Sequence, residues 1–168
     1  MGLATLNVWV HDIVDPCRIS DEPWFVAVTY CNGNAVEWCG HTYWLEEAKC
    51  SHVEFQLPPG CYIIYGFQFF QLKPLPLFRL TARAMVVVGC DQVACAHLYN
   101  PPYRQLPGNA SMAMQYLAET GKLPRDKVSN FVTACDALLA DMPQSSVDRA
   151  FDALLQQLSV AIQKNPPK

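Results

Sequence analysis

The chain lacks the features that mark several functional classes. Its 168 residues contain no apolar run that approaches the ~18 residues needed for a membrane-spanning helix. With a formal net charge of -3, it also has no stripe of Lys and Arg of the kind that binds nucleic acid. We find no glycine-rich phosphate loop, no Ser-His-Asp order and no paired carboxylate motif. The sequence therefore predicts no membrane span and no nucleic-acid partner, and it favours a protein that is not an enzyme.

The N-terminal residues lack a targeting signal as well. The stretch MGLATLNVWVHDIVD has no charged region before its apolar residues and contains acidic residues among them, unlike a signal peptide. Leu6 occupies the position where an N-myristoylation motif has Ser or Thr. We therefore expect a soluble, unprocessed protein of the cytoplasm.

Cysteine, in contrast, is abundant. An even number of cysteines predicts a disulfide framework in a secreted chain. Because no secretory signal is evident, the sequence favours mostly free thiols that pack as small apolar side chains. Some disulfides, for example between Cys90 and Cys95 across a turn, and metal ligation remain alternatives. The 8 cysteines are Cys17, Cys31, Cys39, Cys50, Cys61, Cys90, Cys95 and Cys135.

The pattern of apolar residues changes near residue 100. Before this point, alternating apolar residues and short apolar blocks are separated by Pro, Gly and Asn, which is typical of β-strands. Several short strands at this spacing predict an antiparallel sandwich. We assign this β-sandwich to residues 3–100. Its roughly seven strand candidates are residues 4–10, 24–31, 35–44, 50–57, 61–70, 82–88 and 93–99.

After residue 100 the apolar residues recur at helical spacing. About three helices are expected in residues 109–164, and those at 124–142 and 146–163 carry continuous apolar stripes. The stripes must be buried on each other, on the sandwich or against another chain. The sequence therefore predicts an α+β protein whose helices dock on the sandwich, bind a protein partner or mediate self-association.

The stretch 62–70, YIIYGFQFF, has more aromatic residues than one core face requires. Alternation along a strand places Ile63, Tyr65, Phe67 and Phe69 on a second face. An exposed apolar patch of this size is either a liability or a binding site. We expect the C-terminal helices to cover it, with a partner protein as the alternative.

One run of residues suggests a family. The sequence Phe55-Gln56-Leu57-Pro58-Pro59-Gly60-Cys61-Tyr62-Ile63-Ile64 resembles the signature of carboxypeptidase-regulatory-like domains, which have a prealbumin (transthyretin)-like fold. In this motif Phe55 and Leu57 end one strand in the core, and Tyr62 returns to the core on the next. The resemblance covers about residues 4–100. It implies a seven-stranded prealbumin-like sandwich and a non-catalytic binding or assembly module of unknown ligand.

A second resemblance within the same fold group is to 5-hydroxyisourate hydrolase. That enzyme closes with a Tyr-Arg-Gly-Ser motif and uses histidines near its first and last strands. Here Tyr103 and Arg104 follow the last strand candidate, His11 follows the first, and His97 lies on the last. The Gly-Ser half of the motif is replaced by Gln105-Leu106. Hydrolase activity is therefore a second alternative function.

Two Cys-x-His triplets predict the first alternative, a zinc-type metal site. Residues i and i+2 share one face of a strand, so Cys39 and His41 lie together, as do Cys50 and His52. We expect these four residues on the solvent face of one hairpin that turns at residues 45–49, with His41 opposite His52. Cross-strand Cβ atoms at about 5 Å could then place three of the four around a tetrahedral ion. A redox role and ordinary surface positions are the other interpretations.

A third triplet, Cys95-Ala96-His97, lies on the last strand candidate. The pattern there predicts that Val93, Cys95 and Tyr99 form one packed face, so this triplet is not expected to bind a metal.

Overall fold

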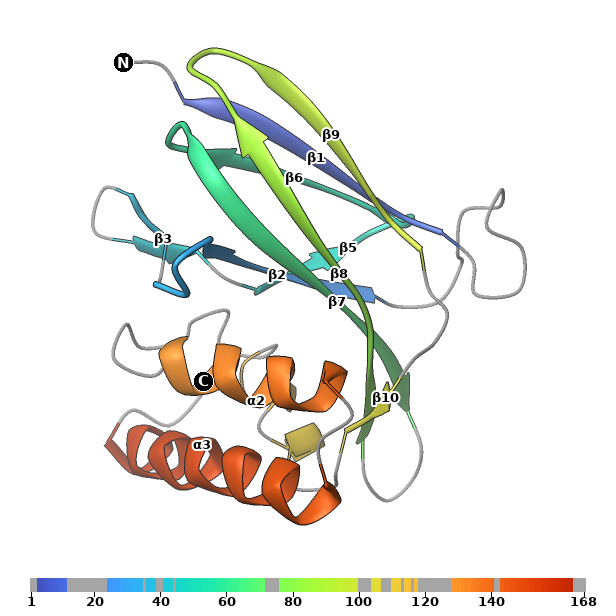
Figure 1. Ribbon diagram of the computed structural model, residues 1–168, viewed down its shortest axis with the longest axis vertical. Coiled ribbons are helices and arrows are strands. Elements are labelled where there is room, and N and C mark those ends of the chain that lie inside the picture. The colour runs from blue at the N-terminus through green and yellow to red at the C-terminus, as the bar shows by residue number, and fades with distance from the viewer. Residues whose placement is uncertain are drawn as a thin grey trace.

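The computed structural model describes residues 3–11, 24–34, 36–38, 41–43, 45–71, 76–99, 104–106, 110–112, 114, 115, 117, 128–140 and 143–164. The protein is α+β, as predicted, with strands followed by C-terminal helices (Figure 1). Its strands are β1 (Ala4–Val10), β2 (Trp24–Tyr30), β3 (Val36–Trp38), β4 (His41–Tyr43), β5 (Leu45–Ala48), β6 (His52–Leu57), β7 (Gly60–Gln71), β8 (Pro76–Val88), β9 (Val93–Leu98) and β10 (Arg104–Gln105). Helical residues between 110 and 117 precede helices α2 (Val128–Leu139) and α3 (Gln144–Lys164).

Two principal sheets contain most of the strands. The smaller is three-stranded with the order β6-β1-β9, and the larger is five-stranded with the order β10-β8-β7-β2-β5. The short pair β3-β4 forms a separate two-stranded sheet, although Val36 of β3 is buried in the core with residues of both principal sheets. The expectation of about seven strands is therefore too low, because β5 and β10 were not recognised and the single candidate 35–44 contains two strands, β3 and β4.

The direction of one pairing also differs from the prediction. Strand β1 is antiparallel to β6 but parallel to β9, with Trp9 opposite His97. The prediction of an entirely antiparallel sandwich is therefore wrong at this pair. Alternating apolar residues identify the two faces of a strand, but they contain no information about the direction of its neighbour.

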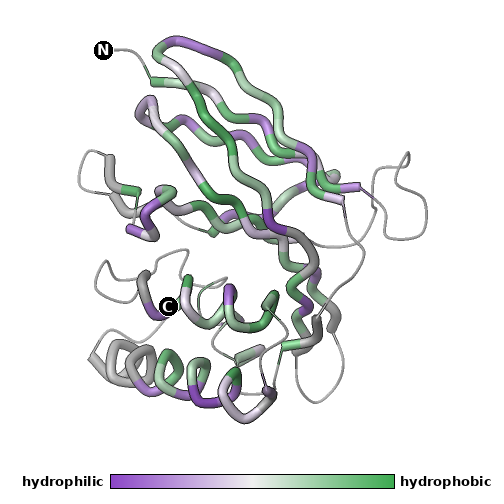
Figure 2. Tube along the Cα trace, in the orientation of Figure 1, coloured by the Kyte–Doolittle hydropathy of each residue, from purple (hydrophilic) through white to green (hydrophobic). Residues whose placement is uncertain are grey.

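Apolar side chains from both principal sheets meet in one core. Alternate residues of β1, such as Leu6 and Val8, pack there with Tyr62 and Ile64 of β7. The predicted inward side chains of the Pro-Pro-Gly motif are buried, with Phe55 3% exposed and Tyr62 fully buried. Hydrophilic and hydrophobic residues alternate along these strands (Figure 2). This core fixes which face of the three-stranded sheet points to solvent.

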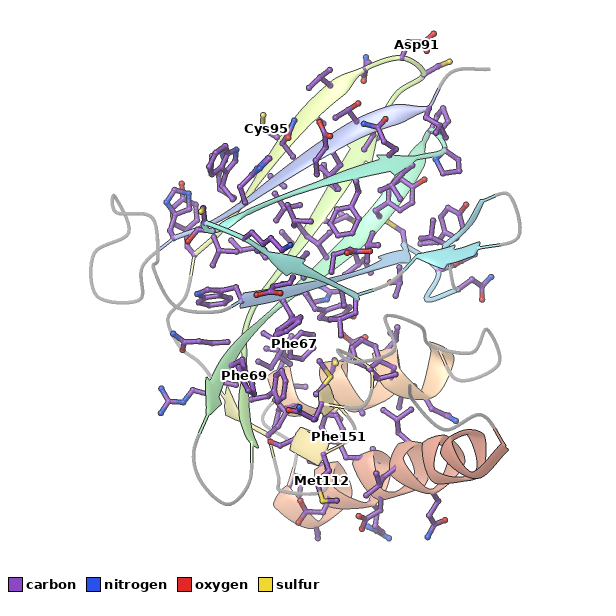
Figure 3. The ribbon with its side chains drawn as sticks, turned by 180° about the vertical axis from the view of Figure 1, so that it is seen from behind. Phe67, Phe69, Asp91, Cys95, Met112 and Phe151 are labelled. Atoms are coloured by element: carbon purple, nitrogen blue, oxygen red, sulfur yellow. A yellow bond between two sulfur atoms is a disulfide. The ribbon has the colours of Figure 1, made fainter. Side chains whose placement is uncertain are left out.

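A second core lies on the other side of the five-stranded sheet, where the helices form a third layer (Figure 1). Ile63, Tyr65 and Phe67 are buried there against Phe131 of α2 and Phe151 of α3. Phe67 lies on the sheet side of this core and Phe151 on the side of α3 (Figure 3). The prediction that the helices cover this face is confirmed. Self-association or partner binding through residues 124–142 and 146–163 stays a prediction.

Strands β7 and β8 form a hairpin that is longer than the strand candidates 61–70 and 82–88 predicted. Strand β8 begins at Pro76, and the two strands remain paired from Gly60↔Val88 to Gln71↔Pro76. The register shifts between Gly66 and Phe67, which is the signature of a β-bulge. The part beyond the bulge also pairs with β10. Pro76 is tolerated because it is the first residue of its strand.

The predicted hairpin between residues 35–44 and 50–57 is wrong. Residues 45–48 form strand β5, which pairs with β2, whereas β3 and β4 pair with each other. The turn lies at Cys50 and Ser51, which both have positive φ, at 53° and 63°. His52 N donates to Lys49 O at 3.1 Å to close it. Two left-handed residues are typical of a tight type I′ hairpin, and no Asn-Gly pair marked it in the sequence.

Cys31 and Cys61 form a disulfide, with Cα atoms 5.5 Å apart. They directly continue the β2–β7 pairing beyond Tyr30↔Tyr62, and Cys31 N donates to Cys61 O at 3.0 Å. Four of the six described cysteines form no disulfide, in agreement with the expectation of mostly free thiols, and this pair is a disulfide of the kind that was left as an alternative. The suggested Cys90–Cys95 bond is wrong, because neither residue is part of a disulfide. Cys50 and Cys135 form no disulfide either, whereas Cys17 and Cys39 lie outside the described residues.

Over the part of the chain that the structure describes, no helix combines the length and the apolar character that a membrane crossing requires.

Candidate functional site

The side of the three-stranded sheet that faces away from the core carries a mixed set of imidazole, aromatic and amide side chains. We call this set the outer face. The register of β1 with β6 and β9 aligns these side chains in rows across the sheet. None is Lys or Arg, and Glu54 is the only carboxylate among them. The outer face consists of Thr5, Asn7, Trp9, His11, His52, Glu54, Gln56, Val93, Cys95, His97 and Tyr99.

At one end of the outer face two histidines meet. His11 Nε2 and His97 Nδ1 are 2.9 Å apart and share a hydrogen bond. The His11 ring stacks on Tyr99, with centroids 4.4 Å apart and an interplanar angle of 14°. His11 N donates to Leu98 O at 3.0 Å, which continues the β1–β9 pairing one residue beyond β1. This backbone bond places the His11 ring beside His97 and Tyr99.

The middle of the outer face is organised around Trp9. The rings of Trp9 and His52 lie 4.3 Å apart between centroids at an angle of 32°. His52 Nε2 donates to Asn7 Oδ1 at 2.7 Å, which orients the imidazole. One row further along, Thr5 Oγ1 donates to Gln56 Oε1 at 3.2 Å. Hydrogen bonds and ring contacts between strands thus order the side chains of this face.

Strand pairing does not place His41 and His52, two of the four predicted metal ligands, opposite each other. His52 lies opposite Trp9, and His41 lies opposite Trp38 in the separate β3–β4 pair. Cys50 occupies the tight turn and is exposed. Cys39 and the side chain of His41 lie outside the described residues, so the Cys39/His41/Cys50/His52 zinc site stays a prediction. Within the residues that the structure describes, no three His, Cys, Asp or Glu side chains converge on one point.

The packed face predicted for the last strand is wrong. Val93 is 69% exposed, Tyr99 is 53% exposed and Cys95 is exposed, whereas Ala96 and Leu98 are buried. Cys95 points away from the molecule (Figure 3). The alternation in VACAHLY is ambiguous, because both sets of alternate residues contain apolar side chains. Only the position of β9 next to β1 decides which set is buried.

His11 and His97, the two histidines of the hydrolase resemblance, lie together. Strand pairing places Arg104, from the Tyr-Arg pair of that resemblance, in the other principal sheet. Arg104 belongs to β10 and lies opposite Leu80 in the five-stranded sheet. Tyr103 lies outside the described residues. Sequence reasoning identified His11 and His97 separately and did not identify Trp9 as part of the site. The polar and aromatic residues at alternate positions of β1 were the available signal.

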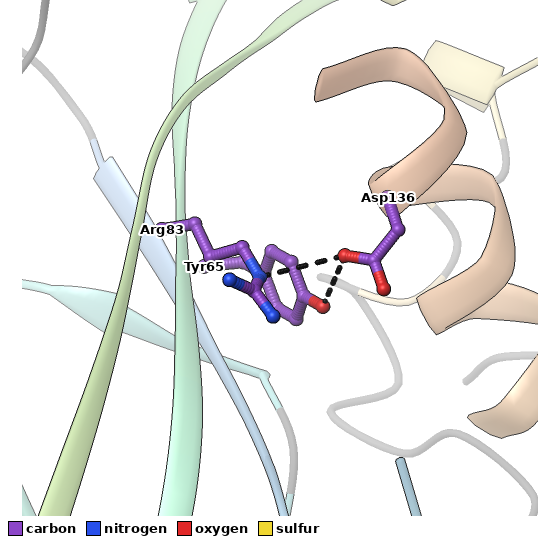
Figure 4. A network of polar contacts seen from close by, with 3 residues as sticks. All are labelled: Tyr65, Arg83 and Asp136. Carbon is purple, nitrogen blue, oxygen red and sulfur yellow. Dashed lines mark hydrogen bonds and ion pairs between the residues drawn. The ribbon is translucent and has the colours of Figure 1, made fainter. Parts of the chain in front are cut away.

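A second polar cluster connects the sheet with helix α2. Tyr65 Oη donates to Asp136 Oδ1 at 2.9 Å, and Arg83 Nε lies 3.5 Å from the same oxygen (Figure 4). Burial raises the pKa of Tyr65 above its usual range, so the phenol remains a donor. Arg83 and Asp136 are each nearly half exposed, at 44% and 47%. This arrangement holds α2 on the sheet and lies away from the outer face.

The fold and the outer face together define an α+β protein with two packed β-sheets, a helical layer and an ordered ring-rich sheet surface. Neither a protein-family model nor a curated protein matches the chain. Its structure is similar to that of a Bacteroides thetaiotaomicron DUF1812 protein proposed to bind polysaccharide, with a TM-score of 0.38 and 11% identity. That similarity covers 56% of this chain and 46% of the other, so it spans less than half of the Bacteroides protein. The function of this chain therefore has to follow from its own surface.

Proposed function

We propose that this chain is a non-catalytic binding module and that a neutral carbohydrate chain binds across its outer face. The observation that carries the proposal is the ordered set of rings around Trp9 and His11 on a solvent-facing sheet surface. A flat ring can stack on the apolar C–H face of a sugar while neighbouring polar groups bind its hydroxyls. Large rigid aromatic side chains with polar neighbours are also typical of recognition surfaces in general.

The polar groups of the outer face suit a neutral polyol. Asn7, His52 and Gln56 provide amide and imidazole donors and acceptors that are already ordered by contacts across the sheet. Because this face has no Lys or Arg, it offers little attraction to phosphate groups and does not favour nucleic acid. With Glu54 as its only carboxylate, it also has no strong negative field.

The shape of the surface favours an extended ligand. Small-molecule sites are usually concave and bury most of the ligand, whereas this site is built on the side of an open sheet. A carbohydrate chain could contact the Trp9 and Tyr99 regions with successive sugar units. Residues 55–64 resemble carboxypeptidase-regulatory-like domains, which often serve as binding or spacer modules. This resemblance supports the more specific proposal that the binding module has a prealbumin-like fold.

Affinity electrophoresis through gels that contain neutral soluble polysaccharides tests the proposal. We expect at least one polysaccharide to retard the wild-type protein. Trp9→Ala and Tyr99→Ala should each weaken binding by roughly 2- to 12-fold, which corresponds to the ~0.5–1.5 kcal/mol of one aromatic contact.

Met85→Ala is the matched control, because Met85 is 69% exposed on the other principal sheet and should not affect binding. Oligosaccharides from the retarding polymer, titrated by calorimetry, would give the affinity of each variant. Absence of retardation across the panel would contradict the proposal. Binding that survives both ring substitutions would place the ligand elsewhere and would contradict it equally.

A further inference from the structure

We propose that His11 and His97 form a binding site for a divalent transition metal of the Ni²⁺ or Cu²⁺ class. The two imidazoles come from neighbouring strands that are far apart in sequence, and their nitrogen atoms Nε2 and Nδ1 are 2.9 Å apart. This site is distinct from the predicted Cys39/His41/Cys50/His52 quartet, with which it shares no residue. It also stands independently of carbohydrate binding, because its formation needs no sugar.

The separation of the two nitrogens indicates which metals fit. With metal–nitrogen bonds of about 2.0–2.1 Å, nitrogens 2.9 Å apart subtend an angle of roughly 90° at the ion. That angle is the one between adjacent ligands in square-planar or octahedral coordination. Tetrahedral zinc would need the nitrogens about 3.3 Å apart. Tetragonal coordination by nitrogen and oxygen is typical of Cu²⁺ and Ni²⁺.

The backbones of the two ligand residues are held in place before any metal binds. His97 is fixed within β9 by its pairing with Trp9, and the His11 backbone is fixed by its bond to Leu98 O. Tyr99 stacks on His11 at an interplanar angle of 14° and restricts rotation of that ring. The ring centroids lie 5.1 Å apart, so the rings meet end to end and both must turn for their lone pairs to converge on one ion. The backbones on which they turn are already in place, which limits the conformational freedom lost on binding.

A metal ion would replace the hydrogen bond and would lie to one side of the line that joins the two nitrogens, because two bonds of about 2.0 Å do not fit along 2.9 Å. In the His11–His97 hydrogen bond, one of the facing nitrogens carries a hydrogen and the other accepts it. For both to bind a metal through their lone pairs, that hydrogen must move to the other nitrogen of its ring or to solvent. No oxidation or reduction is involved.

The remaining coordination positions would be filled by water or by oxygen ligands from solution. His97 and Tyr99 are both exposed, so that side of the site is accessible. Among the described residues no third His, Cys, Asp or Glu completes the group. Cys95 lies on the same face of β9, but it is opposite Asn7 and thus on the side of His97 away from His11. We therefore assign no role to its thiol.

Calorimetric titration of the untagged, full-length protein with NiCl₂ tests the site. We expect one Ni²⁺ per chain. Loss of a residue that merely orients a metal ligand costs about 10- to 100-fold in affinity, so His11→Gln and His97→Gln should each weaken Ni²⁺ binding by at least roughly tenfold. His52→Gln and Cys95→Ser, which change other residues of the same face, should bind Ni²⁺ as the wild type does.

A protein that does not bind Ni²⁺, or binding that survives both His11→Gln and His97→Gln, would overturn the proposal. Loss of binding in Cys95→Ser alone would assign the ion to a thiol and would also overturn it. Paramagnetic broadening of backbone amide signals by Ni²⁺ in the wild-type protein provides a measurement that depends on no variant. We expect broadening centred on residues 11 and 97, and a centre elsewhere would contradict the site.

Discussion

The cysteines of this chain differ in their access to solvent and in how easily they form a thiolate. Cys135 of α2 is fully buried, and burial raises its pKa well above the usual range, with the neighbouring Asp136 charge adding to the effect. Cys50, Cys90 and Cys95 are exposed and form no disulfide. Because the thiolate is the reactive form, access and ionisation both protect Cys135.

This difference predicts selective alkylation of the native protein. With excess iodoacetamide and no denaturant, Cys50, Cys90 and Cys95 should be modified while Cys135 remains unmodified. Peptide mass spectrometry before and after unfolding in guanidinium measures the outcome for each residue. Modification of Cys135 at the rate of the exposed thiols would show that helix α2 does not cover it as the structure indicates.

Other single residues owe their role to position in the sheet. Val93 and Cys95 look suited to a core, yet they face solvent because β9 has the core on the side of Ala96 and Leu98. Trp9 has a large apolar side chain of the kind that is often buried, but it lies among the alternate, outward residues of β1. Which side chains form the outer face therefore depends on the parity of each strand.

At the scale of elements, helix α2 is held on the five-stranded sheet by an apolar and a polar contact to the same tyrosine. The ring of Phe131 meets Tyr65 edge-on, with centroids 6.3 Å apart, and also contacts Phe67 at 5.8 Å. The Tyr65 hydroxyl donates to Asp136 one turn further along α2. The two contacts can be removed separately.

We predict that the apolar contact contributes more to stability. Phe131→Ala should lower the free energy of unfolding by about 3–5 kcal/mol, because it leaves a cavity in the core. Tyr65→Phe removes one half-buried hydrogen bond and should cost about 1 kcal/mol. Urea unfolding followed by circular dichroism measures both, with Thr133→Ala at an exposed position of α2 as the control. A larger loss in Tyr65→Phe than in Phe131→Ala would contradict this order.

At the scale of the whole molecule, the helices and the two sheets form successive layers with two separate cores. The Cys31–Cys61 disulfide joins the ends of β2 and β7 in the central layer, which contributes to both cores. Disulfides persist mainly in oxidising compartments. The disulfide is therefore the feature of this structure that opposes the predicted cytoplasmic location, which stays a prediction.

The disulfide should stabilise the folded state measurably. It closes a loop with a sequence separation of 30 residues, and a loop of this length corresponds to about 3–4 kcal/mol of restricted unfolded-state entropy. We expect Cys31→Ser/Cys61→Ser to unfold at lower urea concentration than the oxidised wild type. Cys50→Ser, which removes a free and exposed thiol, is the matched control.

Wild-type protein treated with a reducing agent should approach the stability of the double variant. If peptide mass spectrometry of the oxidised protein found Cys31 and Cys61 as free thiols, the predicted stabilisation would have no basis. Equal unfolding midpoints for the wild type and the double variant would likewise contradict it.

The sequence by itself determined the local features of this protein. Apolar alternation and helical spacing indicated an α+β chain, the inward positions of Phe55 and Tyr62, and the need for the helices to cover Ile63, Tyr65 and Phe67. These features depend on residues that are close together in the chain. Within a strand or a helix, buried side chains recur at a fixed spacing, whichever elements lie next to it.

Only the tertiary structure decided which strands are neighbours and in which direction they run. The parallel β1–β9 pair, the Cys31–Cys61 disulfide and the His11–His97 contact each join residues that are distant in sequence. Strand pairing depends on the shared burial of whole sheets and on turns such as Cys50–Ser51, which periodicity does not encode. For this reason His11 and His97, from opposite ends of the sandwich sequence, are neighbours. His41 and His52, which are close in sequence, lie in different sheets.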